Sequence, residues 1–223
     1  MVGVLLPDHD AARLRELLGQ AFEGWRWRWR AADVNRSELS PDRKYEIRSR
    51  VLELVGAFSA QLVLAVEDDT AGSGDRWVPM LNALVSHTAL RIAHSTQHPS
   101  TLNVVVEQYG GYSSSRPPPL DVALRSSEIA TPKGWQSVAL KGPEMKTKED
   151  RFPGIVLADF VANAVGVKAK LQKRDFGKSG RASRDIGFSR NHLRGLCGSD
   201  VPVSFCGSYA AFPAALDALS GAI

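Results

Sequence analysis

One acid stands in the middle of an otherwise apolar segment, residues 154–166. The segment reads Gly-Ile-Val-Leu-Ala-Asp-Phe-Val-Ala-Asn-Ala-Val-Gly, and its charged residue is Asp159. Apolar or small residues nearly all round indicate a buried helix. A carboxylate there must find a partner, shift its pKa or hold a cation, because an unpaired buried charge is very costly. Asn163 follows four residues later, so both polar side chains share one stripe of the predicted helix.

Acids also end two segments that the sequence predicts to be buried strands. Glu107 follows the apolar run 102–106, and the acids at 67–69 follow the run 61–66. A side chain at a strand end can emerge at the sheet edge. Carboxylates gathered from separate elements repel one another, and Mg²⁺ or Mn²⁺ relieves that repulsion. Two such ions can clamp the reacting oxygens of a phosphodiester.

Glu107 and Asp159 are therefore candidate metal ligands and catalytic acids, with Asn163 as the group that orients Asp159. Each has a structural alternative. Glu107 can be an ordinary surface acid at the end of a strand. Asp159 can be held by a buried hydrogen-bonding partner such as Asn163 or a tryptophan N–H.

Basic residues are concentrated after this acid. Between 168 and 194 the chain carries nine Lys or Arg against two Asp, while its formal net charge is only +4. Interspersed Gly and Ser predict a flexible loop over 173–194. Such a loop suits a phosphate backbone, and the alternative is a solvated surface loop. The candidate nucleic-acid-binding residues are Lys168, Lys173, Arg174, Lys178 and Arg181.

Strands alternate with helices along the chain, which favours an α/β layered domain. The alternation of Trp and Arg over 25–30 predicts a strand whose indoles pack on a helix or stack on nucleic-acid bases. The other expected strands are 2–6, 61–66, 102–106 and 137–140. The expected helices are 9–22, 41–58, 77–94, the segment around Asp159, and 214–219.

The length of 223 residues suits one large domain, or one domain with an appendage. We expect an α/β domain over 1–172, the basic loop over 173–194, and a C-terminal tail with a docking helix over 195–223. No apolar run reaches membrane-spanning length and no signal peptide is recognisable, so a cytoplasmic protein without a membrane partner is expected. Cys197 and Cys206 are expected to be free thiols. The sequence predicts no oligomeric state.

The stretch from Ile155 to Ala164, with Ala158-Asp159 inside it, resembles the C-terminal signature of the domain of unknown function 3800 family. The order of elements is also similar: an apolar strand, Pro7-Asp8, a first helix, and a strand that ends in an acid at Glu107. The resemblance extends to about Lys170. It implies a ribonuclease H-like fold, a mixed sheet flanked by helices, with acids gathered for Mg²⁺ or Mn²⁺. It thereby implies a metal-dependent nuclease, with Glu107 and Asp159 as ligands.

This sequence departs from the family at its beginning. Members begin with a strand bearing an aspartate-glutamate-serine motif that supplies the first metal ligand, whereas this chain starts at the equivalent of the second strand, 2–6. Two explanations are open: the true protein starts earlier than this sequence, or this copy has lost the strand. In the second case we expect an N-terminally incomplete, truncated sheet with an exposed edge. One hypothesis is a metal-dependent nuclease or phosphodiesterase. The second is a non-catalytic nucleic-acid- or protein-binding module, and the third is a truncated product without a function of its own.

Overall fold

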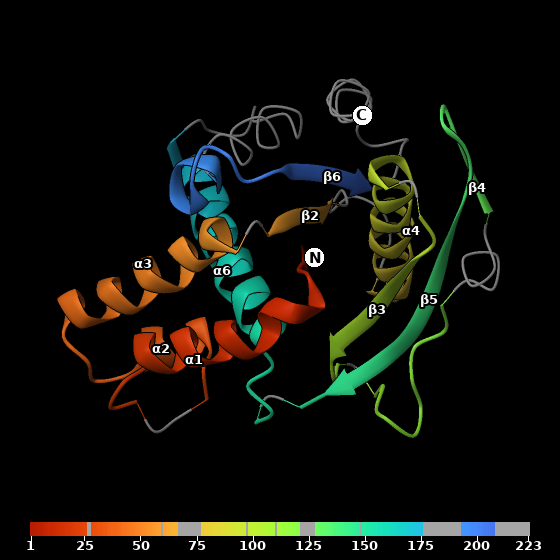
Figure 1. Ribbon diagram of the computed structural model, residues 1–223. Coiled ribbons are helices and arrows are strands. Elements are labelled where there is room, and N and C mark those ends of the chain that lie inside the picture. Colours follow the sequence, from red (N-terminus) through yellow and green to blue (C-terminus); the bar gives the residue numbers. More distant parts are fainter. Residues whose placement is uncertain are drawn as a thin grey trace. The chain divides into compact units, whose positions relative to one another are not determined.

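Figure 1 shows the computed structural model of the chain. The described residues are 1–25, 28–58, 60–66, 77–96, 98–109, 111–120, 128–147, 149–175 and 193–207, with side chains of helix α6 described up to 166. In chain order the elements are β1 (Val2–Leu5), the 3-10 helix η1 (Asp8–Asp10), α1 (Ala11–Ala21), α2 (Ala31–Arg36), α3 (Pro41–Ala57), β2 (Gln61–Val66), α4 (Trp77–Ser95), β3 (Ser100–Glu107), β4 (Glu128–Thr131), β5 (Gly134–Lys146), α6 (Pro153–Asp175) and β6 (Val203–Gly207).

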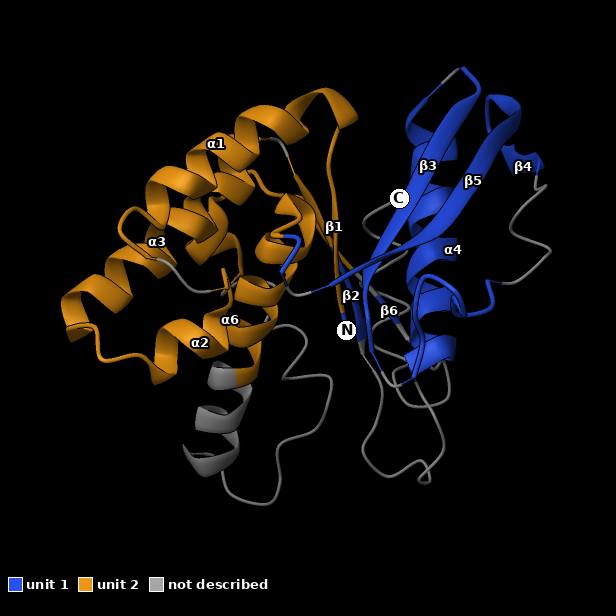
Figure 2. Cartoon of the chain, turned by 90° about the horizontal axis from the view of Figure 1, so that it is seen from below, with its two compact units in different colours: residues 1, 63–150, 205–223 blue, residues 2–62, 151–204 orange. Residues whose placement is uncertain are grey.

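The protein belongs to the mixed α/β class, as the sequence predicts. Its described strands occur in two three-stranded sheets, in the orders β1-β2-β6 and β3-β5-β4. The chain divides into two compact units, shown in Figure 2. Unit 1 contains residues 1, 63–150 and 205–223, and unit 2 contains residues 2–62 and 151–204. The division passes through β2 and β6, so neither unit is one continuous piece of chain.

Unit 2 is mainly helical, and α6 lies at its centre. Helix α6 contacts β1, α1, α2 and α3. Fully buried residues on three of these helices form the core: Leu14 and Leu18 of α1, Ile47, Val51 and Val55 of α3, and Leu157 and Val161 of α6. Their spacing of four residues puts them on one face of each helix. The predicted helices at 9–22, at 41–58 and around Asp159 are confirmed.

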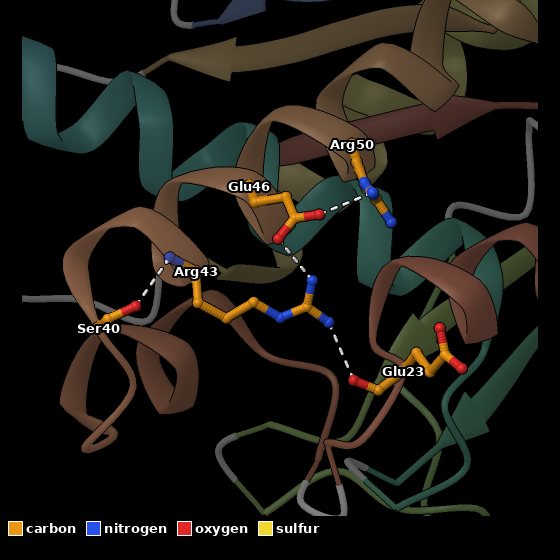
Figure 3. A network of polar contacts seen from close by, with 5 residues as sticks. All are labelled: Glu23, Ser40, Arg43, Glu46 and Arg50. Carbon is orange, nitrogen blue, oxygen red and sulfur yellow. Dashed lines mark hydrogen bonds and ion pairs between the residues drawn. The ribbon is translucent and has the colours of Figure 1, made fainter.

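A polar network on α3 marks how that helix begins (Figure 3). The Ser40 hydroxyl accepts a hydrogen bond from the Arg43 N–H at 3.3 Å, and Pro41 occupies the first helical position. The Arg43 guanidinium donates to Glu46 at 2.6 Å and to the backbone carbonyl of Glu23 at 2.9 Å. Arg50 contacts the other Glu46 oxygen at 2.7 Å. These contacts tie the start of α3 to the chain that follows α1.

The predicted strand over 25–30 is wrong for its described part. Trp25 and residues 28–30 belong to no strand, and α2 begins immediately afterwards at Ala31. Residues 26 and 27 lie outside the described part of the chain. Trp29 and Arg30 are adjacent and both are buried, whereas a strand sends adjacent side chains to opposite faces. Tertiary packing of both residues overrides the local alternation.

In unit 1, helix α4 packs on the sheet β3-β5-β4 (Figure 2). Strand β5 pairs in parallel with β3 and antiparallel with β4. The predicted strands 61–66 and 102–106 and the predicted helix 77–94 are confirmed. The strand expected at 137–140 is the middle of the longer β5, and β4 was not expected. Gly142 of β5 has a φ of 103° beside an irregularity in the β3 register, a conformation that suits glycine.

Some predicted features fall outside the described residues. These are the acids at 67–69, the basic residues between 176 and 192, and the docking helix at 214–219. Within the ranges given above, no helix is both long enough and apolar enough to cross a membrane.

Candidate functional site

Asp159 lies on α6 and contacts the beginning of helix α2. Its Oδ2 accepts a hydrogen bond of 2.7 Å from the backbone N–H of Ala31. Its Oδ1 lies 3.5 Å from the Arg30 Nη1. Ala31 is the first residue of α2, and the first N–H groups of a helix have no partner within the helix. The carboxylate therefore caps α2 from an element 128 residues further along the chain.

Asp159 has a neighbour of opposite charge, Arg30. The Arg30 side chain is 9% exposed and the Asp159 side chain is 30% exposed, so the pair is partly shielded from water. The guanidinium stabilises the carboxylate as an ion pair, and the backbone N–H stabilises it through a charge-assisted hydrogen bond. The sequence predicted that this acid needs a partner, and the structure supplies an arginine and a helix terminus where Asn163 or a tryptophan N–H was expected.

Asn163 contacts α2 one helical turn beyond Asp159. Its Oδ1 accepts a hydrogen bond from Asn35 Nδ2 at 3.3 Å. Asn35 in turn accepts a hydrogen bond from Arg48 through its side-chain oxygen and one of 3.2 Å from Lys44 Nζ through its backbone carbonyl. Asp159 and Asn163 of α6 therefore contact Ala31 and Asn35 of α2, and the two residues on each helix are four positions apart. Two polar contacts at the same spacing hold one helix along the other.

Aromatic rings hold the residues just before α2 from another side. Trp29 stacks on Phe22, with ring centroids 5.2 Å apart and planes 3° apart. Phe22 meets Phe160 of α6 edge to face at 5.7 Å. The Arg151 guanidinium lies 5.1 Å from the centroid of the Trp29 ring, a cation–π distance. The segment that carries Arg30 is thus fixed by apolar packing as well as by the carboxylate. The indole of Trp29 thus packs on Phe22, the residue that follows α1.

Glu107 lies in unit 1, at the end of β3. It is half-buried, and its cross-strand partner on β5 is Lys146. Asp159 lies in unit 2, so one metal site formed by both acids stays a prediction. Among the described residues, no group of three or more His, Cys, Asp or Glu side chains could hold a metal ion.

The basic residues predicted to bind nucleic acid begin inside a helix. Lys168, Lys173 and Arg174 lie within the bounds of α6, which ends at Asp175. The start of the predicted loop, 173–175, is therefore helical. Lys178 and Arg181 lie outside the described residues.

Sequence reasoning missed the aromatic residues of unit 1. Trp77 stacks with Tyr109 at 5.8 Å and with Tyr112 at 5.2 Å, and Tyr109 is 61% exposed. Trp135 on β5 is 70% exposed. A signal for Trp135 was present, because Trp135, Ser137, Ala139 and Lys141 alternate with the more apolar Val138 and Leu140. The predicted strand began at 137 and so omitted the indole.

Comparison with known proteins adds no relative to this picture. No family model matches the chain, and neither a curated protein nor a solved structure matches it. The fold and the contacts therefore define only the class of protein. It is a mixed α/β protein in which Asp159 of α6 accepts a hydrogen bond from the first residue of helix α2.

Proposed function

We propose that this chain is a non-catalytic nucleic-acid-binding module. The observation that carries the proposal is the engagement of both Asp159 oxygens, one by the Ala31 N–H and the other by the Arg30 guanidinium. An acid that binds a catalytic metal must face the cation, whereas this carboxylate faces a cation that the chain itself provides. The sequence marked Asp159 because an acid in an apolar helix needs a partner, and these contacts meet that need.

The residues around Asp159 do not fit a divalent metal. Mg²⁺ and Mn²⁺ take several oxygen ligands, usually including one or two carboxylates. Here the charged neighbour is Arg30, which would repel the ion. The nearby amide oxygen of Asn163 already accepts a hydrogen bond from Asn35. We therefore assign Asp159 and Asn163 to the packing of α2 on α6, and no catalytic step to either residue.

The charge of the chain supports nucleic acid as the partner. The sequence pI is about 9.2, and nine of the 28 Lys and Arg residues fall between 168 and 194. Clustered basic residues neutralise phosphates and release counterions, which makes binding strongly salt-dependent. Lys168, Lys173 and Arg174 are on the last turns of α6, so this basic segment begins within a helix.

A binding titration tests the proposal. Fluorescence anisotropy with labelled single-stranded and duplex oligonucleotides, at about 50 and about 200 mM salt, should give binding that weakens with salt and does not change when EDTA replaces Mg²⁺. The variant Lys173→Gln/Arg174→Gln should bind more weakly than Arg13→Gln/Arg36→Gln, which removes two exposed charges from other helices. Equal affinities for the two variants, or no binding by the native chain, would refute the assignment.

A second candidate is a divalent-metal-dependent nuclease or phosphodiesterase of ribonuclease H-like fold. The similarity of residues 155–164 to the signature of the domain of unknown function 3800 family favours it. So does the position of Glu107 at the end of β3, beside the parallel strand β5. Incubation of oligonucleotides with the chain and Mg²⁺ or Mn²⁺ distinguishes the candidates. Metal-dependent cleavage that disappears in both Glu107→Gln and Asp159→Asn would replace the non-catalytic proposal with this one.

A further inference from the structure

Two cations of helix α3 are held by a neutral residue of α2. The Lys44 Nζ donates to the backbone carbonyl of Asn35 at 3.2 Å, and an Arg48 Nη donates to the side-chain oxygen of Asn35. Both cations are half-buried. Within the described part of the chain, neither of them forms an ion pair. Because the Asn35 oxygens carry no formal charge, the cluster of Lys44, Arg48 and Asn35, called here the Asn35 cluster, keeps both of its positive charges.

The acids of α3 lie on the other side of the helix from these two cations. Glu46 is two positions from Lys44 and from Arg48, and two residues turn an α-helix by about 200°. Arg43 and Arg50 contact Glu46 there (Figure 3), at 2.6 and 2.7 Å. All the acids of α3 share that side, because they are four and seven positions apart: Asp42, Glu46 and Glu53. Helix α3 therefore separates paired charges on one side from unpaired cations on the other.

The acids of the two neighbouring helices have partners of their own. On α2, Asp33 lies 3.4 Å from the Nε of Arg28. On α6, Asp159 lies 3.5 Å from the Nη1 of Arg30. The exposed charged residues that follow Asn35 are one of each sign, Arg36 and Glu38. The surroundings therefore leave the two positive charges of the Asn35 cluster uncompensated.

The Asn35 cluster is joined to the helix that carries the basic segment. Asn163 of α6 accepts a hydrogen bond from the Nδ2 of Asn35 at 3.3 Å. Positions 170 and 174 follow Asn163 by seven and eleven residues, so the three positions share one stripe of α6. Both positions are basic, Lys170 and Arg174. Cations on two helices of unit 2 suit an anion that carries several charges along its length, as a nucleic-acid backbone does.

We infer that a backbone phosphate of bound nucleic acid contacts the Asn35 cluster, with the Arg48 guanidinium and the Lys44 ammonium as its charged donors. The inference rests on the proposed function and adds a phosphate contact outside the basic segment 168–194. A guanidinium has five N–H donors and an ammonium three, so both retain donors beyond those that Asn35 accepts. Both groups bind phosphate through charge-assisted hydrogen bonds. Phosphate contacts carry no base information, so the cluster positions a strand without selecting its sequence.

The test measures the affinity of full-length variants for labelled oligonucleotides by fluorescence anisotropy, between about 50 and about 200 mM salt. Lys44→Gln/Arg48→Gln should weaken binding about tenfold and lower the slope of log affinity against log salt by about 1.5. The loss should be the same for oligonucleotides of different sequence. The matched control, Arg43→Gln/Arg50→Gln, removes the same charge from the same helix, but from arginines that Glu46 already pairs. It should bind nearly as tightly as the native chain.

A second variant changes the charge and leaves both cationic donors in place. Asn163→Asp keeps an oxygen that accepts from Asn35 and adds a negative charge beside the Asn35 cluster. It should weaken oligonucleotide binding without lowering the melting temperature. The control Gln20→Glu adds the same charge at an exposed position of α1 and should leave the affinity nearly unchanged. Circular dichroism and a thermal melt of each variant confirm that the affinities compare folded proteins.

The outcomes separate the phosphate contact from the proposed function. If the native chain binds and Lys44→Gln/Arg48→Gln binds as tightly as Arg43→Gln/Arg50→Gln, the contact is wrong while the proposed function survives. If the native chain binds no oligonucleotide, both fail. If that variant loses affinity for poly-glutamate but not for oligonucleotide, the occupant is an acidic protein. If it loses only the rise in melting temperature that inorganic phosphate gives the native chain, the occupant is free phosphate. Either of these last results overturns the inference.

Discussion

The contact of α6 with α2 in unit 2 and the exposed residues of strand β5 in unit 1 contain the same kinds of side chain in opposite environments. In unit 2, the charges of Asp159 and Arg30 meet each other, and Trp29 is buried against Phe22. In unit 1, Trp135 and Lys141 are exposed. Polar groups that are removed from water must be paired within the chain, whereas exposed groups remain available to a ligand. Asp159 is the strongest functional candidate in the sequence, but both of its carboxylate oxygens already contact groups of the chain itself.

Thiol chemistry gives the largest expected effect, with one reporter in each unit. Cys197 of unit 2 and Cys206 of unit 1 are buried free thiols, and burial raises their pKa to about 12 and about 11. Below those pH values the thiols stay protonated and unreactive. At about pH 8 a thiol reagent should modify the native chain more than about a hundredfold more slowly than the denatured chain. Fast reaction of one cysteine alone would show that its unit opens independently.

Phe160→Ala should cause the largest loss of stability, because it removes a buried ring of unit 2. The loss in the free energy of unfolding should be about 3–5 kcal/mol, measured by denaturant titration. The matched aromatic variant of unit 1, Trp135→Ala, should change that free energy by less than about 0.5 kcal/mol, because the indole is exposed. Similar losses for the two variants would contradict the contrast between a packed aromatic cluster and an exposed indole.

Asp159→Ala should cost about 2 kcal/mol of folding stability, because it leaves the Ala31 N–H and the shielded Arg30 guanidinium without this carboxylate. Asp159→Asn should cost less, because an amide oxygen still accepts from the N–H of Ala31. Thermal melts with and without Mg²⁺ sharpen the point. An increase in melting temperature on adding Mg²⁺ to the native chain but not to Asp159→Ala would favour the metal site over the helix contact.

Ser40→Ala should cost about 1 kcal/mol, because the hydroxyl accepts the N–H of Arg43 at the start of α3. Ser40→Gly should cost only a few tenths of a kcal/mol, since glycine is itself tolerated as an N-cap. Denaturant titration of both variants measures the difference. Equal costs would mean that the Ser40 hydroxyl does not act as an N-cap. Contacts at the surface of unit 2 would then contribute less to its stability than the contact between α6 and α2.

The smallest expected effect concerns pH. The hydrogen bond from Arg43, followed by the charges of Arg43 and Arg50, lowers the pKa of Glu46 below its usual 4.5. A lowered pKa in the folded chain means that the contribution of Glu46 is present above the unfolded pKa and is lost as pH falls through the folded pKa. Glu46→Gln should therefore lose slightly less stability than the native chain on acidification below about pH 4.5. Parallel acid titrations of the two proteins, followed by circular dichroism, measure this. Identical curves would show the ion pairs to be inert.

Local patterns predicted those parts of the fold that depend on neighbours in the chain. Leu14 and Leu18 mark a helical face, Ser40 and Pro41 mark a helix start, and the apolar run 61–66 is the strand β2 with the same bounds. Local sequence patterns gave wrong predictions where residues far apart in the sequence determine the structure. The described part of the Trp-Arg alternation is not a strand, because Trp29 packs on Phe22 while Arg30 contacts Asp159.

The sequence by itself determined that Asp159 lies on an apolar helix and needs a partner, because helical periodicity and the cost of a buried charge are local facts. Tertiary structure alone decided that the partner is Arg30 with the N–H of Ala31, since a contact between elements 128 residues apart has no local signature. It likewise decided that Trp135 stays exposed while Trp29 is buried. Whether an aromatic residue faces water depends on which elements pack over it, and that is a property of the folded chain.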